Sequence, residues 1–510
     1  MANIVFTPKI VADILRSIKN SSSPGPDEIS QRVLKETADA VSLPLSILFQ
    51  KSLASGMVPT DWKRANVVPI FKSGTKRDPS NYRPISLTSV VVRIMERVLK
   101  VKMMSHMKTH RLINPSQHGF LRKKSTSTNL VSYVDYLTRN LDNGLPIDVL
   151  YLDFSKAFDK VPHKRLLQKL KSFNFPTELI SWIKNWLSNR KQRVLVNGEF
   201  SEWLDVVSSV VQGSVLGPIL FVIYINDIDM CLEDMEGFMP KFADDTKVAK
   251  IVKDKKTADE MQAIIHNLEQ WCNTWGMTFN TKKCSIMHFG HRNSQNIYQM
   301  NGEVLNSVPT QRDLGVLISN NSKPSDHCAF AAKKANQVLG QINRSFSCYT
   351  KDIMLQIYKV FVRPHLEYAA TAWAPWHKKD KDILEKIQRR ATRRMSDVSG
   401  NYEERLKTLQ LTTLEERRAR GDAIEVFKYL NGFLDVDRAS LFTLDATDRP
   451  KTRHQQSHLP LKIPHAKLDL RQNFFSVRGA KQWNNLPSAI RESSSVNIFK
   501  NAYDRHHQPF

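Results

Sequence analysis

Three acidic residues stand where an uncompensated charge would be costly. Asp153 lies in the apolar run Val149–Phe154, and the pair Asp244-Asp245 follows two apolar residues. A buried carboxylate lowers stability unless its charge is offset, and divalent cations would offset it. Carboxylates from separate strands can hold two metal ions about 4 Å apart, which is the arrangement that supports phosphoryl transfer. We therefore expect Asp153 and Asp244 to bridge two ions, with Asp245 as a third ligand.

The type of donor atom predicts which metal would bind. The expected ligands are oxygen atoms without Cys or His beside them, which favours magnesium (Mg2+, two ions), with Mn2+ as an alternative, over zinc. A pair of adjacent aspartates is also common at surface turns, so this interpretation depends on the surrounding segments. The five cysteines show no CxxC pair at zinc spacing, which indicates a reducing compartment and no structural metal: Cys231, Cys272, Cys284, Cys328 and Cys348.

The segments that must position the acids have clear patterns. VLYLDF (Val149–Phe154) predicts a strand that carries Asp153, and Pro162 predicts the start of a helix after it. Lys241–Val248 has apolar residues on both sides of the acidic pair and predicts a tight hairpin with the acids near its tip. The helix after Pro162 would bury one face: Leu166, Leu167, Leu170 and Phe173.

The clearest predicted helix follows this hairpin. Thr257 and Glu260 match a capping box, and Gly276 stands where a helix would end. The apolar face between them consists of Met261, Ile264, Ile265, Leu268, Trp271 and Trp275.

The N-terminal part predicts a basic hairpin. Val67–Phe71 has the pattern of a short strand, and Arg83–Leu87 has the pattern of the returning strand. The turn cluster Ser73-Gly74-Thr75 lies between them, and a second cluster spans Ser21–Asp27. The basic residues around the hairpin are Lys72, Lys76, Arg77 and Arg83.

The charge of the chain favours a polyanionic partner. Its 75 Lys and Arg residues outnumber 50 Asp and Glu residues, which gives a formal net charge of +25. Nucleic acid is the leading candidate, against the plainer interpretation of a generally basic protein. Beyond residue 320 the pattern is helical: Ala329–Ile342, then Met354–Val362 ended by Pro364, then a basic stretch of Arg389, Arg390, Arg393 and Arg394.

One charge-free stretch has the length of a membrane span. Val206–Asn226 contains no charged residue, but Gln212-Gly213-Ser214 and Gly217-Pro218 would break a helix facing lipid. The N-terminus shows no secretory signal pattern. We therefore expect no membrane association, no secretion, and a location in the nucleus, the cytoplasm or both.

These segments together resemble the reverse transcriptases of non-LTR retrotransposons (LINEs), and jockey-like elements in particular. YLDFSKAFDKVPH (Tyr151–His163), VVQGSVLGPILFVIYINDI (Val210–Ile228) and FADD (Phe242–Asp245) are similar in order and spacing to polymerase motifs A, B and C. Further similar segments are SPGPDEIS (Ser23–Ser30), VVPIFKSG with NYRPISL (Val67–Leu87), QHGF (Gln117–Phe120), KKCSIMHFG (Lys282–Gly290), DLGV (Asp313–Val316) and the tail FFSVRGAKQWNNLP (Phe474–Pro487).

The resemblance implies roles for individual residues. Asp153, Asp244 and Asp245 would bind the catalytic magnesium ions, and the carbonyl of Phe154 would add a ligand. Phe158 matches the aromatic residue that excludes a ribose 2′-hydroxyl and so selects deoxynucleotides. Four further residues would bind the nucleotide: Lys72 and Arg83 at the triphosphate, and Gln212 and Gly213 in the motif B turn. Lys283 matches the lysine that protonates pyrophosphate, and its neighbour Lys282 leaves that assignment open.

The resemblance also implies a fold and a division of the chain. The expected class is α+β, a right-hand polymerase with fingers, a palm of antiparallel sheet packed on helices, and a helical thumb. The expected parts are fingers with an N-terminal extension at 1–148, a palm with motifs A to E at 149–320, a basic thumb at 321–440 and a C-terminal extension at 441–510. The reverse transcriptase domain would cover about 50–320.

Two departures from the family leave alternatives open. Full elements carry an endonuclease before the polymerase, whereas here the finger motifs begin almost at Met1, so we expect a chain without that domain. Zinc knuckles are also missing from the sequence. The first hypothesis is an RNA-directed DNA polymerase acting on an RNA template, a DNA primer and deoxynucleoside triphosphates. The second is a non-catalytic nucleic-acid-binding remnant, and an intron maturase is a weaker third. The sequence predicts no oligomeric state.

Overall fold

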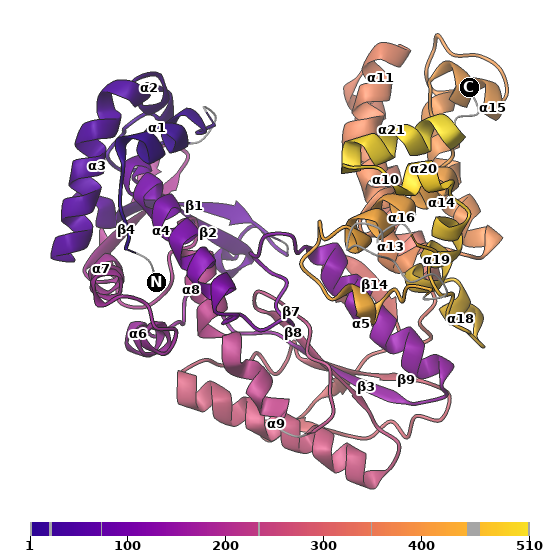
Figure 1. The fold of residues 1–510 in the computed structure, drawn as a ribbon, viewed down its shortest axis with the longest axis horizontal. Helices are drawn as coiled ribbons and strands as arrows, with labels where there is room; N and C mark the ends of the chain where they lie inside the picture. The colour runs from indigo at the N-terminus through magenta and orange to yellow at the C-terminus, as the bar shows by residue number, and fades with distance from the viewer. Residues whose placement is uncertain are drawn as a thin grey trace. The chain divides into compact units, whose positions relative to one another are not determined.

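The chain forms two compact units, each built from separate stretches of sequence (Figure 1). The computed structural model describes residues 3–19, 23–72, 74–232, 235–347, 349–445 and 459–507. Unit 1 comprises Met1–Phe120, Asp153–Glu233 and Ile264–Asn280, and unit 2 comprises Leu121–Leu152, Asp234–Ala263 and Thr281–Phe510. Both units mix helices with sheet, which confirms the predicted α+β class. The consecutive ranges expected for fingers, palm and thumb stay a prediction.

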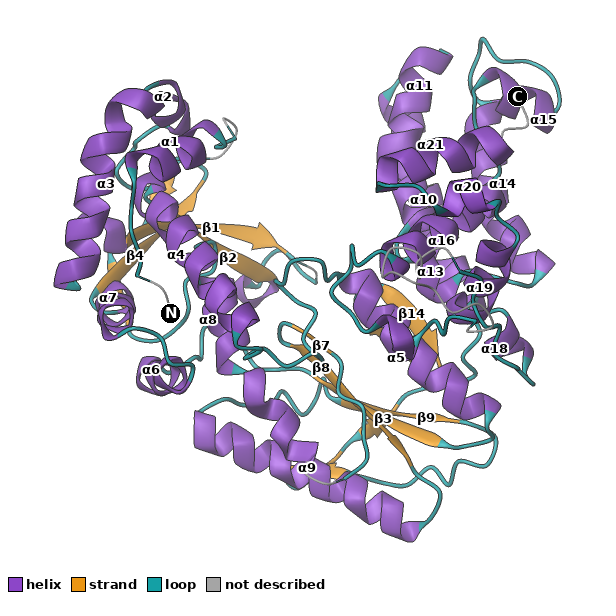
Figure 2. Ribbon diagram, viewed as in Figure 1, coloured by secondary structure: helices purple, strands orange, loops and turns teal. Residues whose placement is uncertain are grey.

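Unit 1 contains a five-stranded sheet in the order β2-β1-β4-β5, with β6 beside β4 (Figure 2). The predicted basic hairpin is confirmed, because β1 and β2 pair antiparallel from Ala65 opposite Thr88 to Phe71 opposite Tyr82. Its strands are β1 (Arg64–Phe71), β2 (Tyr82–Thr88), β4 (Arg190–Val196), β5 (Glu199–Phe200) and β6 (Leu204–Val206). Its helices are α1 (Pro8–Arg16), α2 (Gln31–Glu36), α3 (Ala38–Ser55), α4 (Val90–Thr109), α6 (His163–Ser172), α7 (Thr177–Leu187) and α8 (Gly217–Tyr224).

Unit 2 is organised around β3 (Ile147–Leu152), the middle strand of a sheet in the order β12-β9-β3-β8-β7. Every residue of β3 is buried, which explains why its sequence, IDVLYL, is apolar apart from Asp148 and the Tyr151 hydroxyl. β3 runs antiparallel to both neighbours, β8 (Asp245–Ile251) and β9 (Ser285–Phe289). The remaining strands are β7 (Lys241–Phe242), β10 (Gln299–Met300), β11 (Glu303–Val304), β12 (Asn306–Ser307), β13 (Thr310–Asp313) and β14 (Val316–Ser319).

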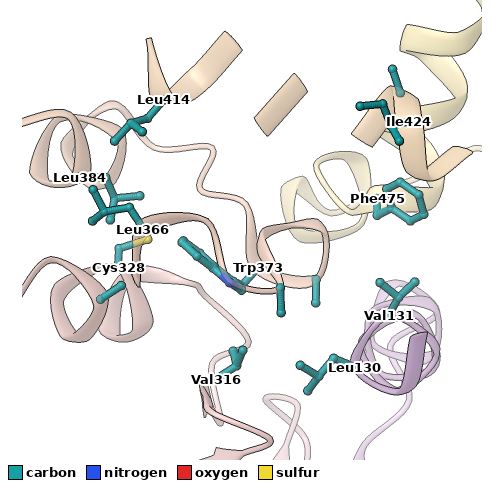
Figure 3. Close-up of a cluster of buried hydrophobic side chains, with 14 of the residues drawn as sticks. Leu130, Val131, Val316, Cys328, Leu366, Trp373, Leu384, Leu414, Ile424 and Phe475 are labelled. Carbon is teal, nitrogen blue, oxygen red and sulfur yellow. The ribbon is translucent and has the colours of Figure 1, made fainter. Parts of the chain in front are cut away.

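The helices of unit 2 share one hydrophobic core with the sheet. Figure 3 shows Leu130 and Val131 of α5 near Trp373 and Phe475, which come from segments far apart in the sequence. The same cluster includes Val149 of β3. The helices are α5 (Thr126–Asp142), α10 (Ser325–Ser345), α11 (Lys351–Ile357), α12 (Arg363–Glu367), α13 (Ala370–Trp373), α14 (Lys378–Arg393), α15 (Tyr402–Thr408), α16 (Leu414–Leu430), α18 (Asp469–Gln472), α19 (Phe475–Asn484), α20 (Ser488–Arg491) and α21 (Val496–His507).

Two details of the predicted helices are corrected. The long helix α9 (Lys255–Trp275) starts before Thr257, because Asp254 caps it by accepting the Thr257 N–H at 2.9 Å. Glu260 instead forms an ion pair with Lys250 at 2.8 Å. Pro364 does not end a helix, since the helical run continues from α11 through the π-helical residues Tyr358–Val362 into α12, whose first turn contains Pro364.

The charge-free stretch Val206–Asn226 divides into the end of β6, a loop and the eight-residue helix α8. Across the described residues, no helix is long and apolar enough to cross a membrane. Among the described residues, the cysteines at positions 231, 272, 284 and 328 are buried and form no disulfide. Cys348 and the Ser21-Ser22 and Ser73 parts of the predicted turn clusters lie outside the described residues.

A buried ion pair joins the C-terminal part of unit 2 to α5. Arg471 donates to Asp135 Oδ1 at 2.7 Å, and both residues are about 5% exposed or less. Asp135 also accepts from the Ser476 hydroxyl at 3.0 Å and pairs with Arg139. The segment around Arg471 is therefore integrated into the same fold as the sheet.

Arg471→Met tests this integration. The variant leaves Asp135 buried with fewer partners, so the free energy of unfolding should fall by about 3 kcal/mol, the scale for breaking one side of a buried pair. Lys255→Met is the matched control, because Lys255 pairs with Asp259 in the open and exposed pairs contribute less than about 1 kcal/mol. Urea unfolding followed by circular dichroism measures both. Equal losses in the two variants would contradict the structural role of Arg471.

Candidate active site

The acidic pair lies at a hairpin turn in unit 2. Phe242 of β7 pairs with Asp245 of β8, so Ala243 and Asp244 form the turn between them. Ala243 has a φ of 56°, in the left-handed region that a tight turn requires. The predicted hairpin with acids at its tip is therefore confirmed.

The register of β3 relates this turn to the first acidic segment. β3 pairs with β8 from Ile147 opposite Ile251 to Leu152 opposite Thr246. Asp153 is the residue after Leu152 in the chain, and Asp245 is the residue before Thr246. In the sequence, therefore, Asp153 comes directly after one member of the last pair, and Asp245 comes directly before the other. Asp153 lies just beyond the strand, which corrects the prediction that it lies within it.

Backbone contacts in unit 1 fix the segment that contains Asp153. The Asp153 carbonyl accepts a hydrogen bond from the Asn280 N–H at 2.7 Å. The next residue, Phe154, forms an isolated antiparallel bridge with Phe279. The two phenylalanine rings lie 4.6 Å apart, and Phe154 is buried. The backbone that carries Asp153 and the Phe154 carbonyl is therefore held against the segment of Phe279 and Asn280.

Lys283 stands at the same end of the unit 2 sheet as the acidic turn. β9 begins at Ser285, which lies opposite Tyr151, and the turn of residues 281–283 precedes it. Lys282 and Lys283 are both exposed. Neither lysine belongs to β9, so strand alternation does not distinguish them.

Phe158 lies against a second aromatic residue in unit 1. Its ring stacks on Phe221 of α8, with centroids 4.4 Å apart and planes 17° apart, and Phe120 meets it edge to face at 6.2 Å. Its carbonyl accepts from the Val210 N–H at 3.0 Å. Phe158 is partly exposed, so part of its ring is accessible. The Phe221 ring packs against the other part and limits movement of Phe158 in that direction.

The Gln212-Gly213 turn is attached to β2. The Gln212 carbonyl accepts from the Ser86 N–H at 2.8 Å, and a Cβ on Gly213 would lie 2.5 Å from the Ser86 carbonyl oxygen. Gly213 also has a φ of 108°, which side chains rarely tolerate. Only glycine allows this close approach to Ser86.

Asp159 was not predicted, but it orients Gln212. The Gln212 side-chain amide donates to Asp159 Oδ1 at 3.1 Å. Burial raises the pKa of Asp159, and the hydrogen bond from Gln212 offsets part of that rise. Both residues line a cavity of about 290 Å³ in unit 1, together with Ser86 and residues of β4 and β6.

Glu96 supports the other side of the same turn. Its carboxylate is fully buried and accepts from the N–H groups of Val215 at 2.7 Å and Leu216 at 3.2 Å, ahead of α8. Trp186 donates to it from the indole nitrogen at 3.1 Å. Burial raises the pKa of Glu96, and the Val215 N–H opposes that rise. A lone glutamate in α4 gave no sequence signal for this role.

Lys72 and Arg83 lie on one face of the basic hairpin. Arg83 is opposite Ile70, and Lys72 follows Ile70 by two positions, so their side chains leave the ribbon on the same side as diagonal neighbours. The pairing continues to Lys72, whose N–H donates to the Asn81 carbonyl at 2.8 Å. Both side chains are exposed, which suits an anionic ligand.

The donor atoms suit a hard cation. Asp153 belongs to unit 1, and Asp244 and Asp245 belong to unit 2. Within the part of the chain that the structure describes, no group of three or more His, Cys, Asp and Glu side chains is gathered as a metal site. The carboxylates and the Phe154 carbonyl offer only oxygen, the donor that magnesium prefers, so the residues fit the ion by chemistry and their metal-binding role stays a prediction.

A family comparison defines the class of protein. A family model described as reverse transcriptase (RNA-dependent DNA polymerase) matches residues 72–342, more than half of the chain. The matched range contains every predicted site residue, from Lys72 to Lys283. The chain therefore belongs to the reverse transcriptase family.

Its relatives narrow the class to jockey-like elements of the non-LTR kind. The RNA-directed DNA polymerase from mobile element jockey of Drosophila melanogaster is 27% identical, over 78% of this chain and 47% of the relative. The jockey polymerase of Drosophila funebris is 26% identical, with the same two coverages. The probable RNA-directed DNA polymerase from transposon BS of Drosophila melanogaster is 25% identical, over 80% of this chain and 47% of the relative. The predicted resemblance is confirmed, and the chain spans about half the length of these curated relatives.

Gly213→Ala tests the close approach at the motif B turn. The methyl group would meet the Ser86 carbonyl and the backbone would be strained, so the free energy of unfolding should fall by about 3 kcal/mol. Gly198→Ala is the control, because Gly198 has a φ of 92° but nothing within 4 Å of its added Cβ, and strain alone costs about 1 to 2 kcal/mol. Urea unfolding compares them. A smaller loss for Gly213→Ala than for Gly198→Ala would refute the contact.

Proposed function

We propose that the chain is an RNA-directed DNA polymerase that adds deoxynucleotides to a primer 3′-hydroxyl, as a non-LTR retrotransposon enzyme. The register of β3 carries the proposal. β3 ends at Leu152, opposite Thr246 of β8, so Asp153 directly follows this strand in the chain and Asp245 directly precedes Thr246. Backbone that directly adjoins a buried strand pair is held by hydrogen bonds, which suits carboxylates that must be positioned to bind metal.

Asp153, Asp244 and Asp245 are the proposed magnesium ligands, with the Phe154 carbonyl as a further donor. When bound, two magnesium ions would supply the positive charge that activates the attacking 3′-oxygen and stabilises the leaving pyrophosphate. The protein holds the ligands in place: the Phe279 ring packs against Phe154, and the hairpin turn fixes the separation of Asp244 and Asp245.

The proposed nucleotide contacts follow from the unit 1 geometry. Lys72 and Arg83 share a face of the hairpin, where the guanidinium can hold two phosphate oxygens at once. Phe158, supported by Phe221, would exclude a 2′-hydroxyl because its ring cannot move back. The backbone at Gln212-Gly213 would approach the incoming nucleotide and the template base.

Lys283 is the proposed acid for the leaving pyrophosphate, with Lys282 as the alternative. Lys283 is exposed in the turn that precedes β9, at the end of the unit 2 sheet where the acidic hairpin turns. A lysine at this point donates a proton without competing for metal, because an ammonium group has no acceptor lone pair.

RNA template and DNA primer are the proposed partners. Exposed arginines on and beside α14 give a positive surface, at positions 389, 390, 393 and 394. A non-catalytic nucleic-acid-binding remnant would need the same charge but no aligned acids. Catalysis therefore separates the two hypotheses, whereas binding alone does not.

Asp244→Ala tests the polymerase directly. Wild-type protein with poly(rA), an oligo(dT) primer, dTTP and magnesium should extend the primer. The variant should lose extension altogether, because a bridging ligand is removed, and should keep its affinity for the RNA–DNA hybrid within about threefold, since one distant carboxylate contributes little to phosphate contacts. Extension is followed on sequencing gels and binding by fluorescence anisotropy.

Asp259→Asn is the control for Asp244→Ala, because Asp259 is exposed on α9 and pairs only across one helical turn with Lys255. It should extend the primer at the wild-type rate. No extension by wild-type protein, with binding retained, would support the remnant instead.

Salt dependence tests the basic surface. Each phosphate neutralised contributes about −0.7 to −0.9 to the slope of log affinity against log salt. The double variant Arg393→Ala/Arg394→Ala should therefore make the slope shallower by about 1.4 to 1.8. Anisotropy titrations between low and moderate salt measure it, and an unchanged slope would exclude these arginines from the interface.

A further inference from the structure

One side chain on α5 holds both arms of the acidic hairpin. Asn129 donates from Nδ2 to the Lys241 carbonyl of β7 at 3.1 Å, and its Oδ1 accepts from the Lys247 ammonium of β8 at 2.9 Å. The turn that carries Asp244 connects those two strands. Asn129 is 1% exposed, so water cannot replace either bond.

Lys247 is a buried charge with three different kinds of partner. It is 3% exposed and forms an ion pair with Asp313, itself 6% exposed. The ammonium also lies 4.5 Å from the centre of the Tyr133 ring. A buried ammonium costs several kcal/mol unless such partners compensate it. Replacing a buried ion pair by apolar residues is often neutral or stabilising, so the geometry that this pair fixes accounts for it better than stability does.

Asp313 reaches Lys247 from a sharp turn. It is the last residue of β13, and the next two residues, Leu314 and Gly315, have φ values of 44° and 91°. The turn therefore ends the strand directly at the ion pair. The DLGV segment that the sequence singled out thus has a specific contact with the acidic hairpin.

The same helix is also tied to the central strand. The hydroxyls of Tyr133 and Tyr151 are hydrogen-bonded at 2.6 Å, and Tyr151 is the β3 residue opposite Lys247. Through Asn129 and Tyr133, α5 therefore contacts β7, β8 and β3 with polar groups that accept only one geometry.

We propose that Asn129, together with Lys247 and Asp313, positions the Ala243–Asp245 turn for catalysis. This inference rests on the proposed polymerase function. The three residues are positioning residues: they do not touch substrate, and they act by holding the backbone that carries the two acids. A displacement of about 1 Å can cost on the order of 100-fold in rate, so such a contact has a large effect without chemistry of its own.

Asn129→Ala in the full chain is the primary test. In primer extension on poly(rA)/oligo(dT) with magnesium, kcat should fall about 100-fold, while KM for dTTP should stay within about threefold, because the nucleotide contacts lie elsewhere. Hydrogen–deuterium exchange should accelerate in the peptide that spans β7 and β8 and stay unchanged in β9.

Asn293→Ala is the matched control. Asn293 makes similar contacts at the other end of β3, to the carbonyls of Ile147 and Phe289 and to the Asp148 carboxylate. It should accelerate exchange there and leave kcat unchanged. An equal loss of kcat in both variants would mean a general loss of stability and would overturn the proposal.

The double variant Lys247→Met/Asp313→Leu guards against misfolding, because it removes both charges and leaves neither one buried alone. It should fold, and its kcat should still fall. Wild-type kcat in this variant would overturn the role of the ion pair. If wild-type protein extends no primer, the proposed function fails, whereas the exchange comparison of Asn129→Ala with Asn293→Ala still decides whether Asn129 holds the hairpin.

Discussion

The register of β3 against its two neighbours is the constraint on which unit 2 depends. Both faces of β3 are buried and largely apolar, so hydrophobicity alone would tolerate a shift of one residue, which would turn each side chain to the other face. Buried polar contacts remove this freedom. At one end Asp148 accepts from His288, Asn293 and Tyr298, and at the other end Tyr151 bonds Tyr133 beside Lys247. A shifted strand would leave these groups without partners in a dry interior, at a cost of several kcal/mol.

The helix α5 links this register to the C-terminal part of the chain. Asn129, in the first turn of α5, is hydrogen-bonded to both strands of the acidic hairpin. Asp135, about two turns later, binds Arg471 and Ser476. The tail FFSVRGAKQWNNLP, with Arg471 just before it, thus supports the unit 2 sheet through α5, by a shared core as well as by polar contacts. A segment without chemistry of its own can therefore be necessary for a site far away in the sequence.

Patterns with strong local causes were predictable. The hairpin around Asp244, the basic hairpin and the strand before Asp153 follow from alternation, turn residues and apolar runs. The limits of prediction were the contacts that need tertiary structure. Asp159, Glu96 and Asn129 look like ordinary polar residues in sequence, and only packing shows what they hold. The helix cap at Asp254 was misassigned to Thr257 because both residues fit a capping pattern, and the hydrogen bonds select the earlier one.

The interleaving of the two units has a consequence for synthesis on the ribosome. The chain passes from one unit to the other after Phe120, Leu152, Glu233, Ala263 and Asn280. Synthesis of unit 2 therefore begins before unit 1 has been completed. The six residues of β3 are all buried in the folded protein, but the strand has no neighbouring strand to pair with until β8, which starts at Asp245, has been synthesised. At typical translation rates that delay is on the order of 5 to 20 s. During this delay the unpaired, largely apolar strand can aggregate with other chains. The yield of folded protein should therefore depend strongly on chaperones that bind nascent chains.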